Sequence, residues 1–334
     1  MSATSERITH SSPEADETPG AAGVALVAGA SRGLGLLIAR ELHRRGYRPI
    51  IAARSADELD RAAARLAAEG VVVSTEVMDV GDADQVAAVV ARIERDVGPI
   101  ELLMCVAGII QVAPLTALER ADFVEAIDVM LWGPVNTALA VVPGMRRRGR
   151  GHIGIISSVG GLISAPHLLP YSTAKFGAVG FARGLRTELT GSGVSVTTVA
   201  PGLMRTGSHL HAWFRGQAAR EYAWFSVAAS APVLSMDAGR AARRIVAGVL
   251  RGRPVVVFTP LARLAPRVDS LAPRVGSAVL SLTVRLLPGW PADGAVPSPK
   301  MEGREAETRL GPRARGRVRW LSSWGRRAAI HTNE

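Results

Sequence analysis

Residues 24–35, VALVAGASRGLG, join a short apolar run to a turn that carries three glycines. The glycines at positions 29, 33 and 35 let the backbone turn sharply and come close to a pyrophosphate, which the first turn of a following helix can hold. The spacing differs from the G-x-G-x-x-G pattern, but the same physics applies. This stretch therefore predicts a strand, a phosphate-binding loop and a helix in direct succession.

Short apolar runs alternate with longer amphipathic segments after this loop, which is typical of a parallel sheet covered by helices. Strands are predicted over 24–29, 48–53, 71–78, 101–107, 152–158, 194–200 and 254–258. Helices are predicted over 34–46, 56–70, 83–98, 119–148, 171–190 and 237–251. We therefore expect an α/β fold: one doubly wound, Rossmann-type parallel sheet of about seven strands with helices on both faces.

The bulk composition narrows the class of protein. The chain has 334 residues and a single cysteine, Cys105, which excludes an internal disulfide and predicts a reducing, cytoplasmic setting. No apolar run reaches the roughly 18 to 20 residues that cross a bilayer. The net charge of +11 would suit a nucleic acid or an anionic membrane surface. Because no recognition motif accompanies the charge, we expect no nucleic-acid partner, and peripheral membrane contact through the C-terminal region stays open.

The end of the second predicted strand bears on the choice of cofactor. A carboxylate there usually holds the adenosine ribose hydroxyls of a dinucleotide. This chain instead has Ala53 and Arg54, and a second cation, Arg32, lies in the glycine loop. Two cations without an acid favour a 2′-phosphate, hence NADP (NADPH), with NAD as the alternative, although in so arginine-rich a chain either cation could be incidental.

The stretch PYSTAKFG, residues 170–177, brings together two rare residues, since the chain has only three tyrosines and two lysines. Positions i and i+4 lie on one face of a helix, so Lys175 can lie beside Tyr171. A nearby cation stabilises phenolate and makes tyrosine a better proton donor or acceptor. The alternative is a tyrosine near a helix start with a solvated lysine one turn later.

Ser158 ends the preceding predicted strand, thirteen residues before Tyr171. Ligands of doubly wound sheets bind at the carboxyl edge, where the glycine loop also opens. The serine hydroxyl could hold a substrate oxygen there while the tyrosine protonates it, or it could be an ordinary polar residue at a strand end.

Together these stretches resemble the short-chain dehydrogenase/reductase family, in its compact single-domain branch, over about residues 22–258. The matching segments are AGASRGLG (28–35), MDV (78–80), CVAG (105–108), ISS (156–158), YSTAK (171–175) and APGLMRT (200–206). The resemblance implies an NADP-dependent oxidoreductase that interconverts a carbonyl and an alcohol on a hydrophobic small molecule. It also implies a homodimer or homotetramer.

The resemblance assigns roles to the matched residues. Tyr171 is the implied acid or base, Lys175 binds the nicotinamide ribose and lowers the tyrosine pKa, and Ser158 orients the carbonyl. The implied cofactor site comprises Gly29, Ser31, Arg32, Gly33, Leu34, Gly35, Arg54, Asp79, Val80, Ala107, Gly108, Tyr171, Lys175, Pro201, Gly202 and Thr206. No metal is expected, because His209, His211 and Glu221 lack convergent spacing.

One position departs from the family pattern. Met130 stands where the family usually has a fourth catalytic residue, an asparagine, and Asn136 lies too far around the predicted helix to replace it. Methionine keeps the backbone carbonyl that takes part in the family's proton relay. A non-catalytic NADPH-binding regulatory or interaction protein therefore remains the alternative function.

These features suggest a division of the chain. Residues 1–22 are expected to be a disordered leader, and 23–258 the NAD(P)-binding Rossmann catalytic domain. Within it, 203–236 holds five of the fifteen Phe, Trp and Tyr residues and predicts a substrate lid, or else a helical hairpin packed on the core. Residues 259–299 form a C-terminal extension, and 300–334 a basic, disordered tail.

Overall fold

The computed structural model describes residues 22–230, 235–258, 260–285, 287–289 and 299–323. Its centre is a seven-stranded sheet in the order β11-β7-β6-β4-β1-β2-β3, and every pairing in it is parallel. The strands are β1 (Val24–Ala28), β2 (Arg48–Ala53), β3 (Ser74–Val77), β4 (Ile100–Cys105), β6 (Gly151–Ile156), β7 (Val194–Val199) and β11 (Val255–Val256). The predicted doubly wound α/β class is confirmed.

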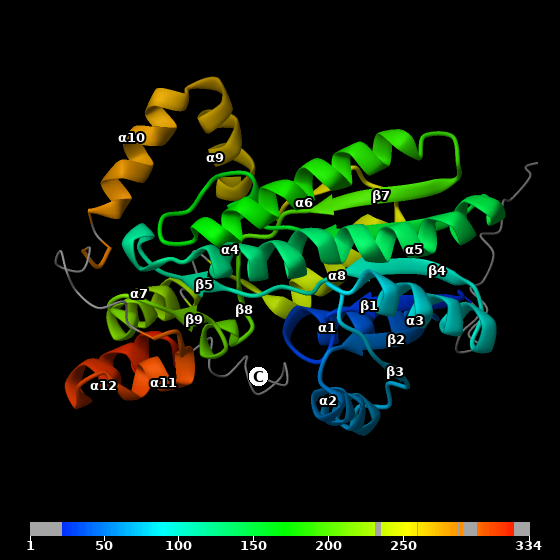
Figure 1. Cartoon of the computed structure of the whole chain (residues 1–334), viewed down its shortest axis with the longest axis horizontal. Helices are drawn as coiled ribbons and strands as arrows, with labels where there is room; N and C mark the ends of the chain where they lie inside the picture. Colours follow the sequence, from blue (N-terminus) through cyan, green and yellow to red (C-terminus); the bar gives the residue numbers. More distant parts are fainter. Residues whose placement is uncertain (1–21, 231–234, 259, 286, 290–298, 324–334) are drawn as a thin grey trace, which may run out of the picture.

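Helices cover both faces of this sheet (Figure 1). They are α1 (Gly33–His43), α2 (Ala56–Ala68), α3 (Ala83–Asp96), α4 (Arg120–Ile127), α5 (Gly133–Arg148), α6 (Leu169–Glu188) and α8 (Ala238–Leu250). Apolar side chains of α1, α2 and α8 form one core against the sheet, and those of α3, α5 and α6 form the other. Cys105 lies in the second core, and burial raises the pKa of its thiol to about 12.

The predicted helix 119–148 is one continuous helix with a defect in the middle. A π-helical turn, Asp128–Trp132, separates α4 from α5, and the amide of Gly133 donates to the carbonyl of Asp128. By length and hydropathy, Arg120–Arg148 could cross a bilayer. Its apolar side chains Met130, Val141 and Met145 are instead buried in the core, which accounts for the hydropathy.

The connection 203–236 folds onto the carboxyl end of the sheet. It contains β8 (Leu203–Arg205), β9 (Trp213–Phe214), α7 (Ala218–Ser230) and β10 (Ser235–Asp237), with 231–234 outside the described residues. The rings of Phe214, Tyr222 and Phe225 pack edge to face in a small core of their own. The aromatic residues thus pack a helical element, which was the alternative to a lid.

The chain after β11 differs from the sequence-based expectation. The extension forms α9 (Pro260–Leu271) and α10 (Pro273–Val284). The expected disordered tail is folded over β12 (Met301–Glu302), α11 (Gly303–Thr308) and α12 (Pro312–Leu321). β12 pairs with β9, and α11 and α12 pack on α7, because Met301, Ala306 and Val318 complete the aromatic core. Most of the expected leader (1–21) and the end of the tail (324–334) lie outside the described residues.

Candidate active site

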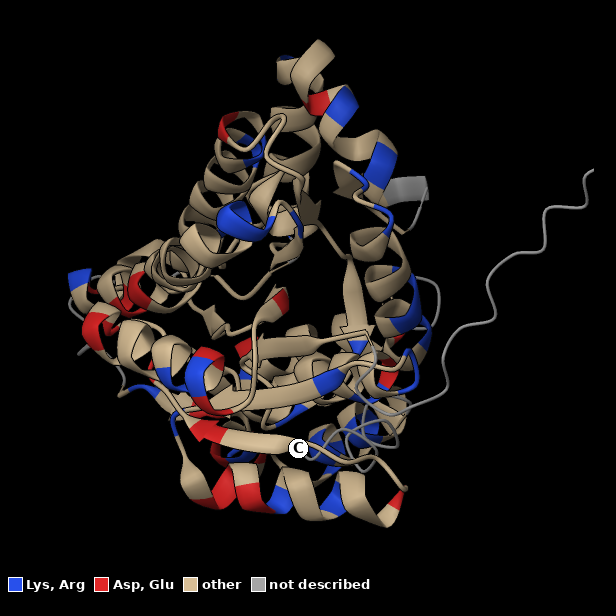
Figure 2. Cartoon of the chain, turned by 90° about the vertical axis from the view of Figure 1, so that its right-hand side faces the viewer, with Lys and Arg blue, Asp and Glu red and all other residues tan. Residues whose placement is uncertain are grey.

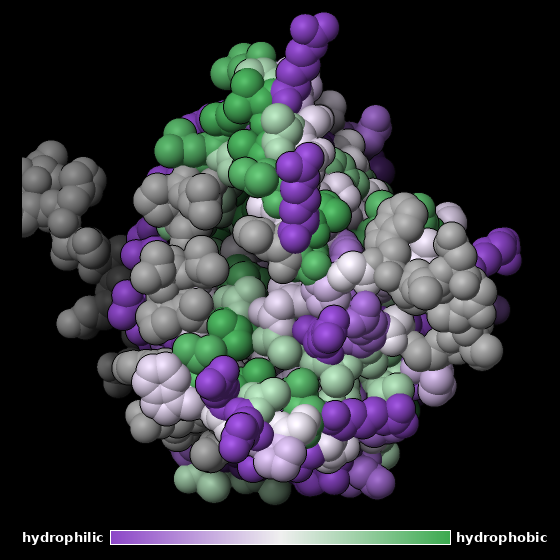
Figure 3. Space-filling model, turned by 90° about the vertical axis from the view of Figure 1, so that its left-hand side faces the viewer, coloured by the Kyte–Doolittle hydropathy of each residue, from purple (hydrophilic) through white to green (hydrophobic). Residues whose placement is uncertain are grey.

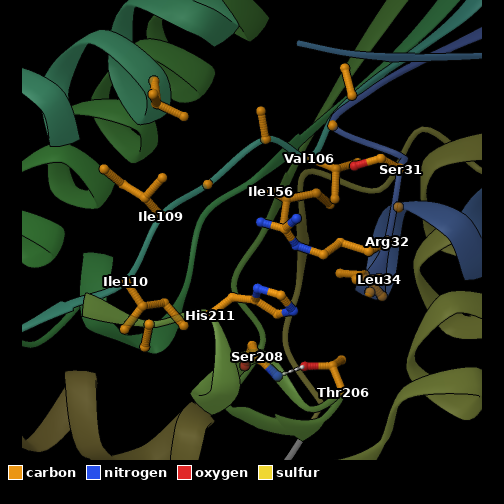
Figure 4. A pocket seen from close by; sticks show the side chains of 18 of the residues that line it. Ser31, Arg32, Leu34, Val106, Ile109, Ile110, Ile156, Thr206, Ser208 and His211 are labelled. Carbon is orange, nitrogen blue, oxygen red and sulfur yellow. Dashed lines mark hydrogen bonds between the residues drawn. The ribbon is translucent and has the colours of Figure 1, made fainter. Parts of the chain in front are cut away.

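A cavity of about 520 Å³ opens at the carboxyl edge of the sheet (Figure 4). The loops after β1, β2, β3, β4, β6 and β7 all contribute to its wall, because parallel strands end at the same edge. Every site residue predicted from the sequence lines it: Gly29, Ser31, Arg32, Gly33, Leu34, Gly35, Arg54, Asp79, Val80, Ala107, Gly108, Ser158, Tyr171, Lys175, Pro201, Gly202 and Thr206.

The glycine loop has no room for side chains. Gly29 has a φ of 92°, and a Cβ built on it would lie 2.3 Å from the amide nitrogen of Ala107. A Cβ on Gly35 would lie 2.1 Å from the carbonyl oxygen of Gly29. The backbone of β1, α1 and the β4 loop therefore comes together tightly at the start of α1, and this cradle fits a pyrophosphate.

A carboxylate missed by the sequence analysis lies beside this loop. Glu58 accepts hydrogen bonds from the Ser31 hydroxyl and the Arg32 guanidinium, both at 2.8 Å. Burial raises the pKa of the Glu58 carboxyl, but these two partners outweigh burial and hold it below its usual range. The backbone amide of Glu58 donates to the Ser55 hydroxyl, which caps the start of α2, while the Glu58 carboxylate is directed to the glycine loop.

Arg54 contrasts with Arg32. Its side chain is exposed at the mouth of the cavity, and no carboxylate in the described part of the chain lies within ion-pair distance of it. Arg32 already shares its charge with Glu58. Arg54 is therefore the cation that remains available to a phosphate at this end of the cavity.

The loop after β3 is held by Asn136 of α5. Its side-chain amide donates to the carbonyl of Val80 at 2.9 Å, while Asp79 accepts from the amide of Gly81 at 3.0 Å. Asn136 thus shapes the wall of the cavity near Asp79 and Val80, far from the position of the missing asparagine.

Ser158 and Tyr171 face each other deeper in the cavity. A Cβ built on Gly160 would lie 3.1 Å from the Tyr171 ring and 3.6 Å from the Ser158 hydroxyl oxygen, so both side chains meet beside Gly160. The Ser158 hydroxyl accepts from the amide of Gly160 at 3.0 Å. Burial raises the pKa of Tyr171, and the nearby Ser158 hydroxyl lowers it by less. The tyrosine therefore keeps its proton at neutral pH.

Lys175 lies one turn along α6 and is buried. Its ammonium donates to the carbonyl of Ile156 at 2.7 Å and lies 5.8 Å from the centroid of the Tyr171 ring. Burial lowers the pKa of Lys175 to about 8, against a smaller opposing effect of Cys105. The predicted proximity of the two side chains is present, but burial rather than the lysine governs the tyrosine pKa in this geometry.

Met130 is buried in the π-helical turn next to these groups. A Cβ on Gly108 would lie 3.6 Å from the Met130 sulfur and 3.7 Å from the Lys175 ammonium. The thioether therefore fills the space on the helix side of Gly108, and π turns are frequent at functional sites.

The part of the cavity that the glycine loop does not line, which we call the substrate half, is mostly apolar. Ile109, Ile110, Val129, Met204, Ala212 and Trp213 line it. The polar groups there are paired: Glu125 with Lys300, and His211 with Glu302 at 2.7 Å. Lys300 also lies 4.9 Å from the centroid of the Trp213 ring. Sequence reasoning missed Glu125, Lys300 and Glu302.

His211 is held from the C-terminal segment on both ring nitrogens, by Glu302 and by Arg304 at 3.2 Å. Figure 4 shows His211 and Arg32 pointing toward each other across the pocket. Burial, followed by the charge of Arg32, lowers the pKa of His211. Glu221 points elsewhere and accepts from His167 and Trp224, so His211 and Glu221 do not converge on one point.

The family model for short chain dehydrogenase matches residues 23–213 of this chain. The chain belongs to the short-chain dehydrogenase family. It is 38% identical over 182 residues to gluconate 5-dehydrogenase of Gluconobacter oxydans, covering 54% of this chain and 71% of that protein. It is 37% identical over 183 residues to acetoacetyl-CoA reductase of Paracoccus denitrificans, covering 55% and 75%.

Solved short-chain dehydrogenases share the fold. Actinorhodin polyketide ketoreductase with NADPH superimposes with a TM-score of 0.64 at 27% identity, over 72% of this chain and 96% of that one. Gluconate 5-dehydrogenase from Burkholderia cenocepacia, with NADP and tartrate, gives 0.62 at 28% identity, over 72% and 94%. The chain is therefore an oxidoreductase of the carbonyl/alcohol type that uses a nicotinamide cofactor, and it has segments beyond those that superimpose.

Proposed function

We propose that this enzyme reduces the carbonyl group of an apolar small molecule with NADPH and uses Tyr171 as the proton donor. One observation carries the proposal: a single cavity joins the glycine cradle and Arg54 to Ser158, Tyr171 and Lys175. A polyketide ketoreductase with NADPH and an acetoacetyl-CoA reductase among its relatives support ketone reduction.

The chain supplies the binding groups for the cofactor. The glycine loop and the start of α1 would hold the pyrophosphate, and the unpaired Arg54 would bind a 2′-phosphate. Pro201, Gly202 and Thr206 line the cavity on the side of Ser158 and would border the nicotinamide. When bound, the reduced nicotinamide supplies a hydride to the carbonyl carbon.

The protein's own chemistry is the placement of one proton. The Ser158 hydroxyl would orient the carbonyl oxygen, and the Tyr171 hydroxyl would donate its proton to that oxygen. A raised pKa suits this direction, because the tyrosine is protonated at neutral pH. The ammonium of Lys175, close to the ring, would stabilise the phenolate that remains.

The class of substrate follows from the substrate half of the cavity. Its lining is apolar, and both of its carboxylates already have partners: Glu125 pairs with the ammonium of Lys300, and Glu302 is hydrogen-bonded to His211. A charged substrate would have to break one of these pairs. An uncharged, largely apolar ketone or aldehyde loses no such interaction and gains apolar contact area.

We also propose a homo-oligomer assembled through the outer side of α5 and α6. Trp132 at the end of the π-helical turn, Leu139 of α5 and Phe176 of α6 have exposed fractions of 51%, 62% and 44%. Large exposed apolar residues on neighbouring helices are typical of protein interfaces. Light scattering of the wild type and of Leu139→Asp would test this proposal.

The test of the proposed function has two stages. Cofactor fluorescence is titrated with NADPH and NADH, and NADPH oxidation is then followed with a panel of apolar ketones and aldehydes beside charged analogues. The proposal expects tighter binding of NADPH and turnover of the uncharged compounds. Preference for NADH, or turnover confined to carboxylate substrates, would contradict it.

A further inference from the structure

The hairpin of α9 and α10 presents an apolar surface that the rest of the molecule does not cover. No residue of α10 is buried. Seven large apolar side chains are exposed along the hairpin, Val284 (40%) among them; the other six are Leu264 (56%), Val268 (46%), Leu271 (87%), Val275 (54%), Val279 (57%) and Leu282 (60%). Their spacing of three or four residues places them on one side of each helix.

The hairpin has a defined geometry. Its helices pack against each other where a Cβ on Gly276 would lie 2.2 Å from a carboxylate oxygen of Asp269. Ala262 is buried, and Arg263 donates to the carbonyl of Val257 at 3.1 Å, so the base is attached to the sheet domain. The apolar side chains are therefore held outward by an ordered element.

The hairpin also carries a concentration of positive charge. Residues 260–285 contain four arginines and one acid, Asp269, which gives a net charge of +3 (4 − 1). The arginines are Arg263, Arg267, Arg274 and Arg285, and all four are exposed. Across the part of the chain that the structure describes, none of them pairs with a carboxylate.

The arginines of the central domain differ from those of the hairpin in their pairing with acids. Its arginines often pair with acids, as Arg40 does with Glu69 and Arg92 with Glu76. Figure 2 shows basic and acidic residues interspersed on its helices. The cationic and apolar character of the hairpin is therefore a local feature and does not simply follow from the composition of the whole chain.

We propose that the α9–α10 hairpin docks on a lipid bilayer with anionic headgroups. Exposed arginines beside a row of aliphatic side chains suit the boundary between phosphate headgroups and acyl chains. A nucleic acid would use the cations and leave the aliphatic row in water. A second copy of the chain would bring two like-charged hairpins together, which Coulomb repulsion opposes.

The position of the hairpin determines which end of the enzyme faces the bilayer when the hairpin docks. β11 is parallel to β7, so the chain leaves β11 at the carboxyl edge of the sheet, where the cavity lies, and enters α9 there. Figure 1 shows the hairpin at the end of the molecule that also holds α7 and β9. Figure 3 shows apolar side chains with long hydrophilic ones at the corresponding corner of this face. Docking turns this end of the enzyme toward the bilayer.

The test is sedimentation of the full chain with two kinds of vesicle: phosphatidylcholine alone, and phosphatidylcholine mixed with phosphatidylglycerol at about 7:3. We expect at least about tenfold tighter binding to the anionic vesicles. Two double variants test the surface: Leu271→Asp with Val275→Asp, and Arg267→Glu with Arg274→Glu. Each is expected to weaken this binding at least about tenfold. Because these side chains are exposed and do not line the cavity, thermal unfolding and turnover are expected to be unchanged.

Matched controls lie on the sheet domain. Val72→Asp changes a valine that is 74% exposed, and Arg61→Glu reverses an exposed arginine of α2. Both are expected to bind vesicles like the wild type. Equal binding to both kinds of vesicle, or to neither, would overturn the proposal.

Two further results would also overturn it. Trp320 on α12 is 76% exposed and lies among arginines, so Trp320→Asp tests the competing surface. Loss of binding in that variant, with normal binding in both hairpin variants, would move the contact to α12. A lower oligomeric state of the hairpin variants by light scattering, with vesicle binding unchanged, would make the hairpin a contact between copies.

Discussion

Replacing Lys175 with methionine is expected to abolish turnover and, at pH 7, to raise the free energy of unfolding. The buried ammonium has a pKa of about 8, against 10.5 for a free lysine, because burial penalises its charge. A shift of this size corresponds to about 3 kcal/mol at pH 7. Loss of the hydrogen bond to the Ile156 carbonyl costs about 1 kcal/mol. The net gain is therefore about 2 kcal/mol.

The shifted lysine pKa makes the free energy of unfolding of the wild type depend on pH in one direction. The folded pKa lies below the unfolded one, so the unfolded chain binds more protons between pH 8 and pH 10.5, and the wild type gains stability as the pH rises through that window. The charge penalty falls to about 1.4 kcal/mol at about pH 9.5, where the advantage of Lys175→Met should nearly vanish.

The assay is urea unfolding followed by tryptophan fluorescence at these two pH values, with equal m-values as the check on comparability. Lys300→Met is the control, because this partly exposed lysine pairs with Glu125, and its loss should leave stability unchanged or lower it. A Lys175→Met protein that is less stable than the wild type at pH 7, or a difference that does not vary with pH, would refute the reasoning.

Four other changes test the rest of the site. Arg54→Asp should weaken NADPH binding about tenfold or more and leave NADH binding unchanged. Glu58→Gln frees Arg32 from its ion pair and should therefore strengthen NADPH binding about threefold or more. Fluorescence titration measures both affinities. Truncation after residue 299 uncovers the aromatic core and should therefore lower the free energy of unfolding by about 3 kcal/mol or more. It also removes Glu302 from the cavity wall and should raise the KM. Unchanged unfolding and kinetics would contradict this. Met130→Asn should preserve turnover but lower stability by about 1–3 kcal/mol, since its amide is buried beside Gly108; a collapse of turnover in a folded protein would show that the thioether is required.

The sequence predicted the sheet and the cofactor half of the cavity because their signals are local. Apolar runs define the strands, the glycine loop and Ser158 follow strand ends, and Tyr171 lies in the first turn of α6 with Lys175 one turn later. Parallel topology alone then brings these residues to one edge, without any knowledge of side-chain contacts.

The substrate half could not be predicted in the same way. Lys300 and Glu302 reach the cavity through β12, a two-residue strand paired with β9, and so short a pairing leaves no periodic pattern. Their charges suggested a solvated tail instead. The Glu58 carboxylate contacts Ser31, 27 positions away in the sequence, and no local pattern reports such a contact. The tyrosine pKa depends on burial, which spacing does not report either.

The most direct test of the account is the kinetics of Tyr171→Phe with an active ketone substrate, next to NADPH affinity measured on the same preparation. Tyr47→Phe, away from the cavity, is the matched control. We expect turnover to fall at least about a hundredfold in Tyr171→Phe, with NADPH affinity nearly unchanged and the control unaffected. Turnover close to the wild type would show that another group delivers the proton and would contradict the proposed mechanism.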